Sequence, residues 1–452
     1  MKTLIKNALL VAVMDDKRTK IPGGDVLIEN NVIKAVGKNL AADGVTKTID
    51  ASGCVALPGF VNTHHHLYQT LTRNIAAVQD AKLFDWLVHL YEIWAGLDPE
   101  IVRVSTQLGL AELLLTGCTT STDQFYVFPH GQPTDLIDRQ VEAAREVGMR
   151  FQPCHGSMSR GKSKGGLPPD RVVQEEDAIL KESERLIAKH HDSKPLAMTR
   201  ISLAPCSPFS VTSELLVETA KLARAKKVRI HTHLAETLDE EQFCIDMHGL
   251  KPLAYMEKVG WIGPDVWYAH CVHMSDDEIK LMGKTKTGVA HCPTSNLRLG
   301  SGIAPIRKML DAGVPVSIAV DGSASNDTSD MLGELRQCLL VHRIKSGVGS
   351  MPAEDVFYMA TRGGAAVLGR DDIGSLEAGK AADIAIFDMK KIGYAGALHD
   401  PLAALVFCGD SHIARTVIVN GKIVVDGGRL ASIDEEKLFA SADILSRKFI
   451  GA

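Results

Sequence analysis

Eight short apolar runs, each followed by a helical segment, dominate the middle of this 452-residue chain. One helical segment, TSELLVETAKLARAKK, places Leu215, Leu216, Ala220 and Leu222 at helical spacing. Eight consecutive β/α units predict an α/β fold of the TIM type, a (β/α)₈ barrel, rather than a doubly wound sheet. The expected barrel strands are residues 59–66, 118–125, 149–156, 199–206, 229–236, 265–272, 288–295 and 315–322.

The two ends of the chain follow a different pattern from the middle. Residues 1–57 and 373–452 are rich in strand-forming residues interrupted by glycine and asparagine turns. Asn420-Gly421 between two apolar runs is typical of a tight hairpin. We therefore expect both ends to meet in one small β-sandwich domain that is discontinuous in sequence. Residues 58–372 would then form the catalytic barrel.

Ionisable residues gather at the C-terminal ends of the expected strands, where barrel enzymes keep their chemistry. His64 and His66 end the first strand, His233 lies near the end of the fifth, and Asp321 ends the eighth. Because side chains alternate along a strand, His64 and His66 point one way and His65 the other. Three imidazoles and a carboxylate at one barrel mouth predict a divalent metal site. Zinc suits this ligand set, and Fe²⁺ is also compatible with it.

Two further strand-end residues suit the chemistry of such a metal. A metal with an open position binds water and lowers its pKa toward about 7. Asp321 can take the first proton from this water, and Glu236, three residues past His233, is expected to shuttle a proton to the substrate. His270 is expected to hydrogen-bond the attacking water or the developing oxyanion. Alternatively, Glu236 is a surface carboxylate at the start of a helix without a catalytic role.

Three other histidines lie close to the same strand ends. His273, just past the sixth strand, is expected behind the site or in packing. His155 and His291, on the third and seventh strands, are each compatible with lining the mouth or with a structural role.

Composition argues against several classes of partner. The net charge is −5, and no dense Lys/Arg stripe is present, so neither a nucleic acid nor an anionic membrane is expected as a partner. The first apolar run alternates and ends at Asp15-Asp16, which favours a strand over a signal peptide. Nine scattered cysteines without a CxxC pair are typical of reduced thiols in a cytoplasmic protein.

Four motifs together resemble the amidohydrolase superfamily, in its branch of aminohydrolases that act on purine, pterin and triazine rings. They are PGFVNTHHH, HLAET, YAHCVH and VDGSASND. The resemblance covers essentially the whole chain. It implies one metal bound by the HxH pair, the histidine of HxxE and the eighth-strand aspartate, with the glutamate of HxxE and the sixth-strand histidine completing catalysis. These positions are His64, His66, His233, Asp321, Glu236 and His270.

We expect one metal ion rather than two, and we expect the protein to form a homo-oligomer. Many binuclear members of the superfamily carry a carbamylated lysine at the end of the fourth strand, where this chain reads TRISLAPC. The unrelated zinc deaminase design, with H-x-E and PCxxC, is absent as well. Relatives are commonly dimers or larger, which implies a similar assembly here.

The stretches HHHLYQTLTRN, KLFDWLVHLYEIWAGL and GSMSRGKSKGGLPP resemble the members that deaminate 8-oxoguanine to urate and ammonia. The expected ligand is therefore a small amino-substituted oxopurine. Gln69 offers an amide that can read its edge, and Trp86 matches a substrate-contacting position of adenosine-type relatives. Cys206 replaces a substrate-contacting histidine of those relatives, which favours a free base over a nucleoside. Isoxanthopterin, guanine and hydroxylated triazines are the alternative substrates.

Two other readings stay open at this point. Some proteins with this fold have lost their metal and serve as assembly scaffolds, but such a chain is expected to lack several ligands that are present here. Dechlorination or amide cleavage would use the same metal without deamination.

Overall fold

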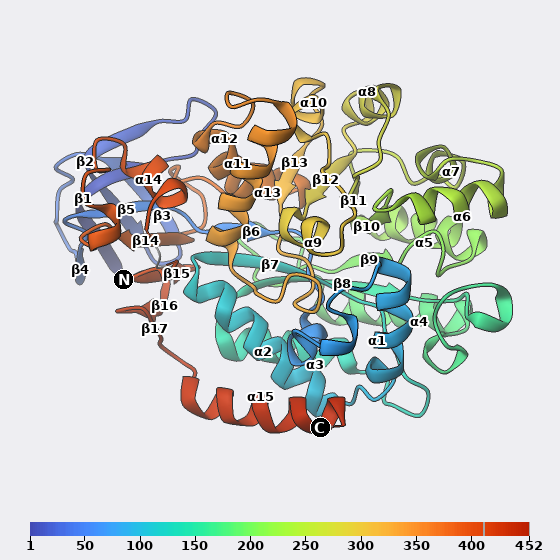
Figure 1. Ribbon diagram of the computed structural model, residues 1–452. Coiled ribbons are helices and arrows are strands. Elements are labelled where there is room, and N and C mark those ends of the chain that lie inside the picture. Colours follow the sequence, from blue (N-terminus) through green and yellow to red (C-terminus); the bar gives the residue numbers. More distant parts are fainter. Residues whose placement is uncertain (410–411, 452) are drawn as a thin grey trace.

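Eight parallel strands form one sheet of the computed structural model, which describes residues 1–409 and 412–451. Consecutive strands are neighbours, in the order β13-β12-β11-β10-β9-β8-β7-β6 (Figure 1). All eight expected strands are present, so the predicted barrel is confirmed. Their bounds are β6 Phe60–Asn62, β7 Cys118–Phe125, β8 Arg150–Ser157, β9 Ser202–Pro205, β10 Ile230–Leu234, β11 Val266–His270, β12 Gly288–His291 and β13 Val316–Ile318.

Hydrogen bonds close the barrel between the segments that follow its first and last strands. The Val320 amide donates to Oδ1 of Asn62 at 3.0 Å, and the Asp321 amide donates to the carbonyl oxygen of His64 at 3.2 Å. Several strands end earlier than predicted, β6 at Asn62 and β13 at Ile318. The residues predicted to bind metal in these two segments therefore lie just beyond the regular ladder, at the mouth.

Helices alternate with these strands and surround them (Figure 1). Local capping signals set their ends: the Asp98 side chain accepts from the Ile101 amide at 2.8 Å at the start of α2, and Ser275 and Glu278 form a capping box on α8. The helices are α1 Leu83–Trp94, α2 Pro99–Leu115, α3 Leu136–Val147, α4 Glu176–His190, α5 Ser213–Lys226, α6 Leu238–His248, α7 Pro252–Lys258, α8 Asp276–Thr285, α9 Pro293–Arg298, α10 Ile306–Asp311, α11 Met331–Ser346, α12 Ala353–Tyr358 and α13 Gly364–Val367.

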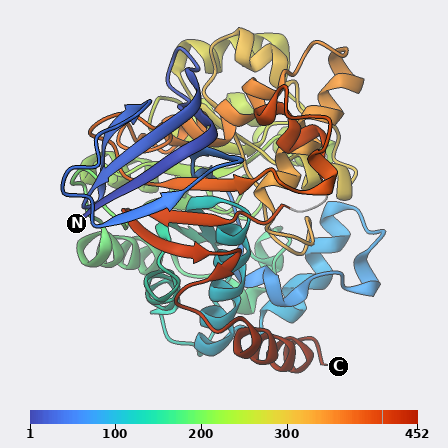
Figure 2. The same ribbon diagram turned by 90° about the vertical axis from the view of Figure 1, so that its left-hand side faces the viewer.

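The remaining strands, drawn from both ends of the chain, form a second, mixed sheet. Its order is β17-β16-β15-β14-β5-β1-β2-β3, with β4 paired to β1, and Figure 2 shows blue and red strands side by side. The predicted meeting of the two ends is thus confirmed. The bounds are β1 Lys2–Ala12, β2 Lys20–Glu29, β3 Val32–Gly37, β4 Lys47–Asp50, β5 Cys54–Pro58, β14 Ile384–Asp388, β15 Thr416–Val419, β16 Lys422–Asp426 and β17 Arg429–Leu430.

The predicted hairpin at Asn420-Gly421 joins β15 to β16. Asn420 has φ 49° and Gly421 has φ 78°, and the two strands pair antiparallel. Positive φ at both central residues is the geometry that an Asn-Gly pair favours, because its twist matches that of the flanking strands.

Helices α14 Pro401–Phe407 and α15 Glu435–Ile450 interrupt the strand-rich C-terminal region. Leu438, Ala442 and Leu445 of α15 belong to the apolar cluster that contains Trp94 of α1. The Ser446 hydroxyl donates to the carbonyl oxygen of Leu71 at 2.7 Å. The last helix therefore packs on the barrel and not on the sheet of the chain ends. Its i, i+4, i+7 apolar spacing was the available signal for it.

All nine cysteines are free thiols, and eight of them are buried. Among the described residues, no helix is long and apolar enough to cross a bilayer.

A buried ion pair joins the barrel to the second sheet. Arg150, at the start of β8, donates to both carboxylate oxygens of Asp383 at 2.9 and 3.1 Å. Asp383 also accepts from the amide of Asn420 at 2.7 Å, and the two charged side chains are only 0% and 4% exposed. Breaking a buried pair leaves an unpaired charge, so this contact is costly to disturb.

We expect Asp383→Asn to lower the free energy of unfolding by about 3–5 kcal/mol, because the Arg150 guanidinium would stay buried without its counterion. Urea denaturation followed by circular dichroism measures the change. Glu218→Gln is the matched control, since it breaks the exposed pair with Lys221 and should cost less than about 1 kcal/mol. Equal effects of the two substitutions would contradict this role for Asp383.

Candidate metal centre

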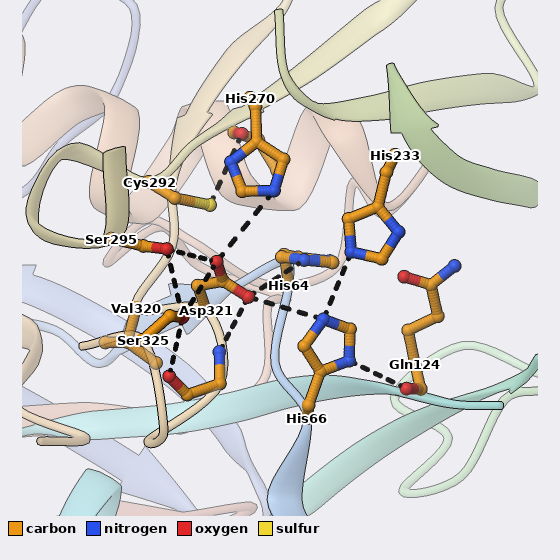
Figure 3. Close-up of polar contacts among 12 residues, drawn as sticks. His64, His66, Gln124, His233, His270, Cys292, Ser295, Val320, Asp321 and Ser325 are labelled. Atoms are coloured by element: carbon orange, nitrogen blue, oxygen red, sulfur yellow. Dashed lines mark hydrogen bonds and ion pairs between the residues drawn. The ribbon is translucent and has the colours of Figure 1, made fainter. Parts of the chain in front are cut away.

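The four side chains predicted to bind metal converge at the mouth of the barrel (Figure 3). His64 and His66 follow β6, His233 lies in β10, and Asp321 follows β13. Nε2 of His66 lies 3.1 Å from Nε2 of His233. Oδ1 of Asp321 lies 3.2 Å from Nε2 of His64 and 3.3 Å from Nε2 of His66. The fold therefore gathers residues from three separated segments at one point.

Main-chain oxygens fix the orientation of two of the imidazoles. His66 donates through Nδ1 to the carbonyl oxygen of Gln124 at 2.9 Å, and His233 donates through Nδ1 to that of Cys206 at 2.6 Å. A neutral imidazole that donates through Nδ1 keeps a bare lone pair on Nε2. Both Nε2 atoms are therefore acceptors.

The third imidazole is fixed by another histidine. His231 donates through Nδ1 to the carbonyl oxygen of Trp267 at 2.9 Å, so its Nε2 accepts. Nδ1 of His64 lies 2.7 Å from that acceptor and must donate to it. Nε2 of His64 is left bare, buried and without a hydrogen-bond partner among the described residues.

Three bare lone pairs thus face one buried volume. Burial lowers the pKa of His64, His66 and His233, so the imidazoles are neutral, which is the form that binds metal. Nitrogens 2.0–2.1 Å from a tetrahedral zinc ion lie about 3.3 Å apart, close to the observed separations. His64, His66 and His233 form a metal-binding group, and their chemistry fits zinc.

The two carboxylate oxygens of Asp321 have different partners. Oδ2 accepts from the hydroxyls of Ser295 at 2.6 Å and Ser325 at 3.4 Å, while Oδ1 faces the histidines. The residue has φ 66°, and a left-handed backbone at a residue other than glycine costs about 1–3 kcal/mol. Such strain is typical of functional positions, and here it turns the carboxylate toward the predicted metal.

The two residues predicted to complete catalysis also lie at this point. Nε2 of His270 is 3.6 Å from Oε2 of Glu236 and 3.8 Å from Oδ2 of Asp321. Nδ1 of His270 donates to Oδ1 of Asn296 at 2.9 Å. Burial lowers the pKa of His270, but the carboxylates of Glu236 and Asp321 outweigh it and raise the pKa overall. Burial raises the pKa of Glu236, so its proton is retained to higher pH than usual.

Neighbouring groups hold Glu236 in place. The Ser301 hydroxyl donates to Oε1 of Glu236 at 3.2 Å, and His273 donates through Nε2 to the Ser301 carbonyl oxygen at 3.0 Å. The buried carboxylate of Glu240 accepts from the amides of Ala235 at 2.8 Å and Glu236 at 3.0 Å. His273 thus lies behind the site and contacts Glu236 only indirectly, through Ser301.

The other histidines near the strand ends have partners outside the predicted metal site. His65 is buried, and its Nε2 lies 3.0 Å from the Ser329 hydroxyl, pointing away from the site as strand alternation predicted. His155 lies 2.8 Å from the Ser183 hydroxyl. Nε2 of His291 lies 3.0 Å from Nε2 of His342, so this ring has a partner on α11. Together with Cys338 these two buried histidines form a second cluster whose possible ligand atoms lie within 4.8 Å of one another.

Sequence reasoning missed the residues that orient the histidines. His231 supports His64, Asn296 supports His270, and the Ser295 hydroxyl supports Asp321. His231 stands two residues before His233, so the repeated HxH spacing was a usable signal. Nothing in the sequence marks Asn296 and Ser295, because their role depends on the turn of α9 toward the mouth.

A cavity opens beside these groups and is lined by all three residues predicted to contact substrate, Gln69, Trp86 and Cys206. Burial raises the pKa of Cys206 to about 12, so it is a neutral thiol. The rest of the lining combines catalytic groups with apolar and aromatic side chains, among them Leu83, Leu87, Tyr91, Tyr126, Phe209 and Leu299. A mainly apolar wall with few polar groups is the usual form of a site for a flat small molecule.

Comparison with known proteins gives the same assignment. The model of the amidohydrolase family matches residues 55–424. The chain belongs to the amidohydrolase family. It is similar to 8-oxoguanine deaminase from Pseudomonas aeruginosa, with 46% identity over 94% of each chain. It is also similar to isoxanthopterin deaminase from an unknown prokaryotic organism, at 37% identity over 99% of this chain and 97% of the relative.

Among solved structures, this amidohydrolase resembles atrazine chlorohydrolase TrzN from Arthrobacter aurescens TC1, complexed with zinc. The TM-score is 0.95 at 37% identity, covering 98% of this chain and 100% of that one. With the histidine group described above, these relationships identify a metal-dependent hydrolase of the deaminase type. The complete histidine group does not fit a scaffold that has lost its metal.

Purified, metal-replete amidohydrolase is expected to contain about one equivalent of zinc or iron per chain, measured by inductively coupled plasma mass spectrometry. His233→Ala should reduce this below about 0.3 equivalents, because it removes one of three nitrogen ligands. The exposed His89→Ala is the matched control and should keep the full content. Undiminished metal in His233→Ala would show that the ion binds elsewhere.

Proposed function

We propose that this amidohydrolase hydrolyses the amino group of 8-oxoguanine, giving urate and ammonia. The observation that carries a deamination is the buried carboxylate of Glu236, which lines the cavity 3.6 Å from His270 and beside the metal-binding group. The similarity to 8-oxoguanine deaminase at 46% identity supports the choice of ring.

Unpaired donors in the cavity support an oxygen-bearing heterocycle. Nε1 of Trp86, the hydroxyl of Tyr91 and Nε2 of Gln69 are buried and have no hydrogen-bond partner among the described residues. Oε1 of Gln69 accepts from the Ala324 amide at 3.3 Å, which leaves the amide nitrogen as the free group. Buried donors without partners are costly, and ring oxygens and nitrogens of an oxopurine would satisfy them.

The cavity is smaller than the proposed substrate. Its volume is about 30 Å³, enough for water but not for a bicyclic ring. Side chains of the lining must therefore move when the ring binds. A cavity that closes in this way would also exclude bulk water from the reacting groups.

His64, His66, His233 and Asp321 would hold one divalent ion, with zinc favoured by the ligand chemistry and iron as the alternative. When bound, such an ion lowers the pKa of a water molecule toward about 7 and makes it a nucleophile at neutral pH. Asp321 would accept a proton from water there, since Oδ1 of its carboxylate lies 3.2 Å from Nε2 of His64.

Glu236 then carries protons between water and substrate. Burial raises its pKa, which favours its action as a proton donor, so it can protonate a ring nitrogen as the water oxygen bonds to the ring carbon that bears the amino group. It next assists transfer of a proton to the amino group, which leaves as ammonia. His270, held by Asn296, donates a hydrogen bond to the oxygen as charge develops on it.

The substrate assignment is tested by measuring ammonia release from a panel of rings. We expect the highest kcat/KM for 8-oxoguanine and values at least tenfold lower for guanine, isoxanthopterin and hydroxylated triazines, because the extra ring oxygen engages otherwise unpaired donors. Isoxanthopterin is the main alternative, supported by the relative at 37% identity. If the enzyme deaminates a pterin but releases no ammonia from 8-oxoguanine, the proposed substrate is wrong. If it releases chloride but no ammonia from a chlorotriazine, the proposed reaction is wrong.

Glu236→Gln is expected to lower kcat by about 10²-fold or more while the metal content stays unchanged, because the amide keeps the shape of the side chain but cannot transfer a proton. Glu241→Gln is the matched control and should retain near-normal turnover, because Glu241 is a half-buried residue of α6 that pairs with Lys251 outside the cavity. Near-normal turnover of Glu236→Gln would remove it from the mechanism.

A further inference from the structure

A second cavity lies at the opposite end of the barrel from the metal-binding group. Its volume is about 610 Å³. Arg229 and Asp265 line it and directly precede the first residues of β10 and β11, and Arg200, which also lines it, stands two residues before β9. It therefore lies at the amino ends of these strands, beside the end of α5, where Arg224 and Lys227 line it. We call it the basal cavity.

Positive charge in the basal cavity exceeds negative charge. Arg200, Arg224, Lys227 and Arg229 line it, with Asp265 as the one carboxylate among its lining residues. That carboxylate is already engaged, because Oδ2 of Asp265 accepts from Nε of Arg224 at 2.9 Å. The other three cations have no lining carboxylate of their own.

Arg229 has the fewest partners of the three arginines. Its Nε is buried, and its side chain forms no hydrogen bond or ion pair with any residue in the described part of the chain. The guanidinium lies 5.9 Å from the ring centroid of Trp267, and a Cβ at Gly369 would lie 2.6 Å from Nη1. Burial lowers the pKa of Arg229 to about 10, against the attraction of Asp265. The residue as a whole is half-buried, but a guanidinium nitrogen buried without a partner costs free energy, which an anion would offset.

Arg200 has a similar deficit. Its Nε is buried without a partner in the described residues, and Nη2 lies 3.9 Å from the Asp372 carboxylate. That carboxylate is committed to Arg370, which donates to it at 2.9 and 2.8 Å. Nη2 of Arg200 also donates to the carbonyl oxygen of Lys194 at 3.3 Å, so Nε is the nitrogen left without a partner. The amino-terminal face of a barrel usually serves stability. A buried guanidinium nitrogen without a partner does not contribute to it, and an anion in the cavity would satisfy this nitrogen.

We propose that the basal cavity binds a phosphate-bearing small molecule. Guanidinium groups match phosphate oxygens in pairs of parallel hydrogen bonds, and the lysine adds a further charge. A volume of about 610 Å³ lies in the range of sites for small molecules and exceeds what one phosphate ion fills. The site is separate from the metal centre and does not depend on the proposed substrate.

Isothermal titration of the metal-loaded enzyme with inorganic phosphate and with adenosine monophosphate tests this site. Arg229→Gln is expected to raise the Kd about tenfold or more, the usual effect of losing a charged hydrogen bond. Lys227→Gln changes an exposed side chain, which cannot disturb the core, and should raise the Kd about threefold. Arg145→Gln, an exposed arginine on α3, is the matched control and should leave the Kd within about twofold.

Either ligand binding with this dependence supports the proposal, and tighter binding of the nucleotide would show that more of the cavity than a phosphate site is used. Absence of binding by both ligands up to about 10 mM would overturn it, as would a Kd unchanged in Arg229→Gln and Lys227→Gln. A Kd unchanged in both variants would indicate that the anion binds at the metal centre and not in the basal cavity. Because Arg229 lacks a partner, Arg229→Gln should also keep or raise the Tm of the ligand-free enzyme. A large fall would assign Arg229 a purely structural role.

Discussion

Three imidazole lone pairs directed at one buried point are the constraint on which the rest of this amidohydrolase depends. Each imidazole keeps a bare lone pair on Nε2 because its Nδ1 donates a hydrogen bond to Gln124, Cys206 or His231. Because no proton lies between Nε2 of His66 and Nε2 of His233, a cation is needed at this point to offset their repulsion. The neighbouring strands of the barrel therefore supply acceptors as well as ligands.

Buried carboxylates keep the loops at the mouth in position. Glu334 accepts from Nδ2 of Asn326 at 2.6 Å and from the Thr294 amide at 3.3 Å, which ties the segment after β13 to α9. Asp123 accepts from the amide of Leu67, just after the first histidines. Burial raises the pKa of Asp123 to about 7 and that of Glu334 to about 8. Each carboxylate thus holds a segment that flanks the predicted site. Asp321 and His270 themselves have left-handed backbones, with φ 66° and 71°.

The two ends of the barrel use charge in opposite ways. At the mouth, His64, His66 and His233 direct bare nitrogens at the predicted metal, and carboxylates lie beside them. At the basal cavity, Arg229 and Arg200 hold buried nitrogens without partners in the described residues. The ion pair of Arg150 with Asp383 shows that the same end of the barrel can neutralise a buried guanidinium completely. This contrast between Arg150 and the two arginines of the basal cavity is the basis for proposing an anion site there.

The sequence by itself determined the barrel, the meeting of the chain ends and the residue types at the mouth, because strand periodicity and strand-end position are local properties. It did not determine α15, whose apolar face has meaning only against Trp94 and its neighbours. Nor did it determine which nitrogen of each histidine is bare, or that Asn296 holds His270. Hydrogen-bond partners from distant strands make those choices, and only the tertiary structure brings them within reach.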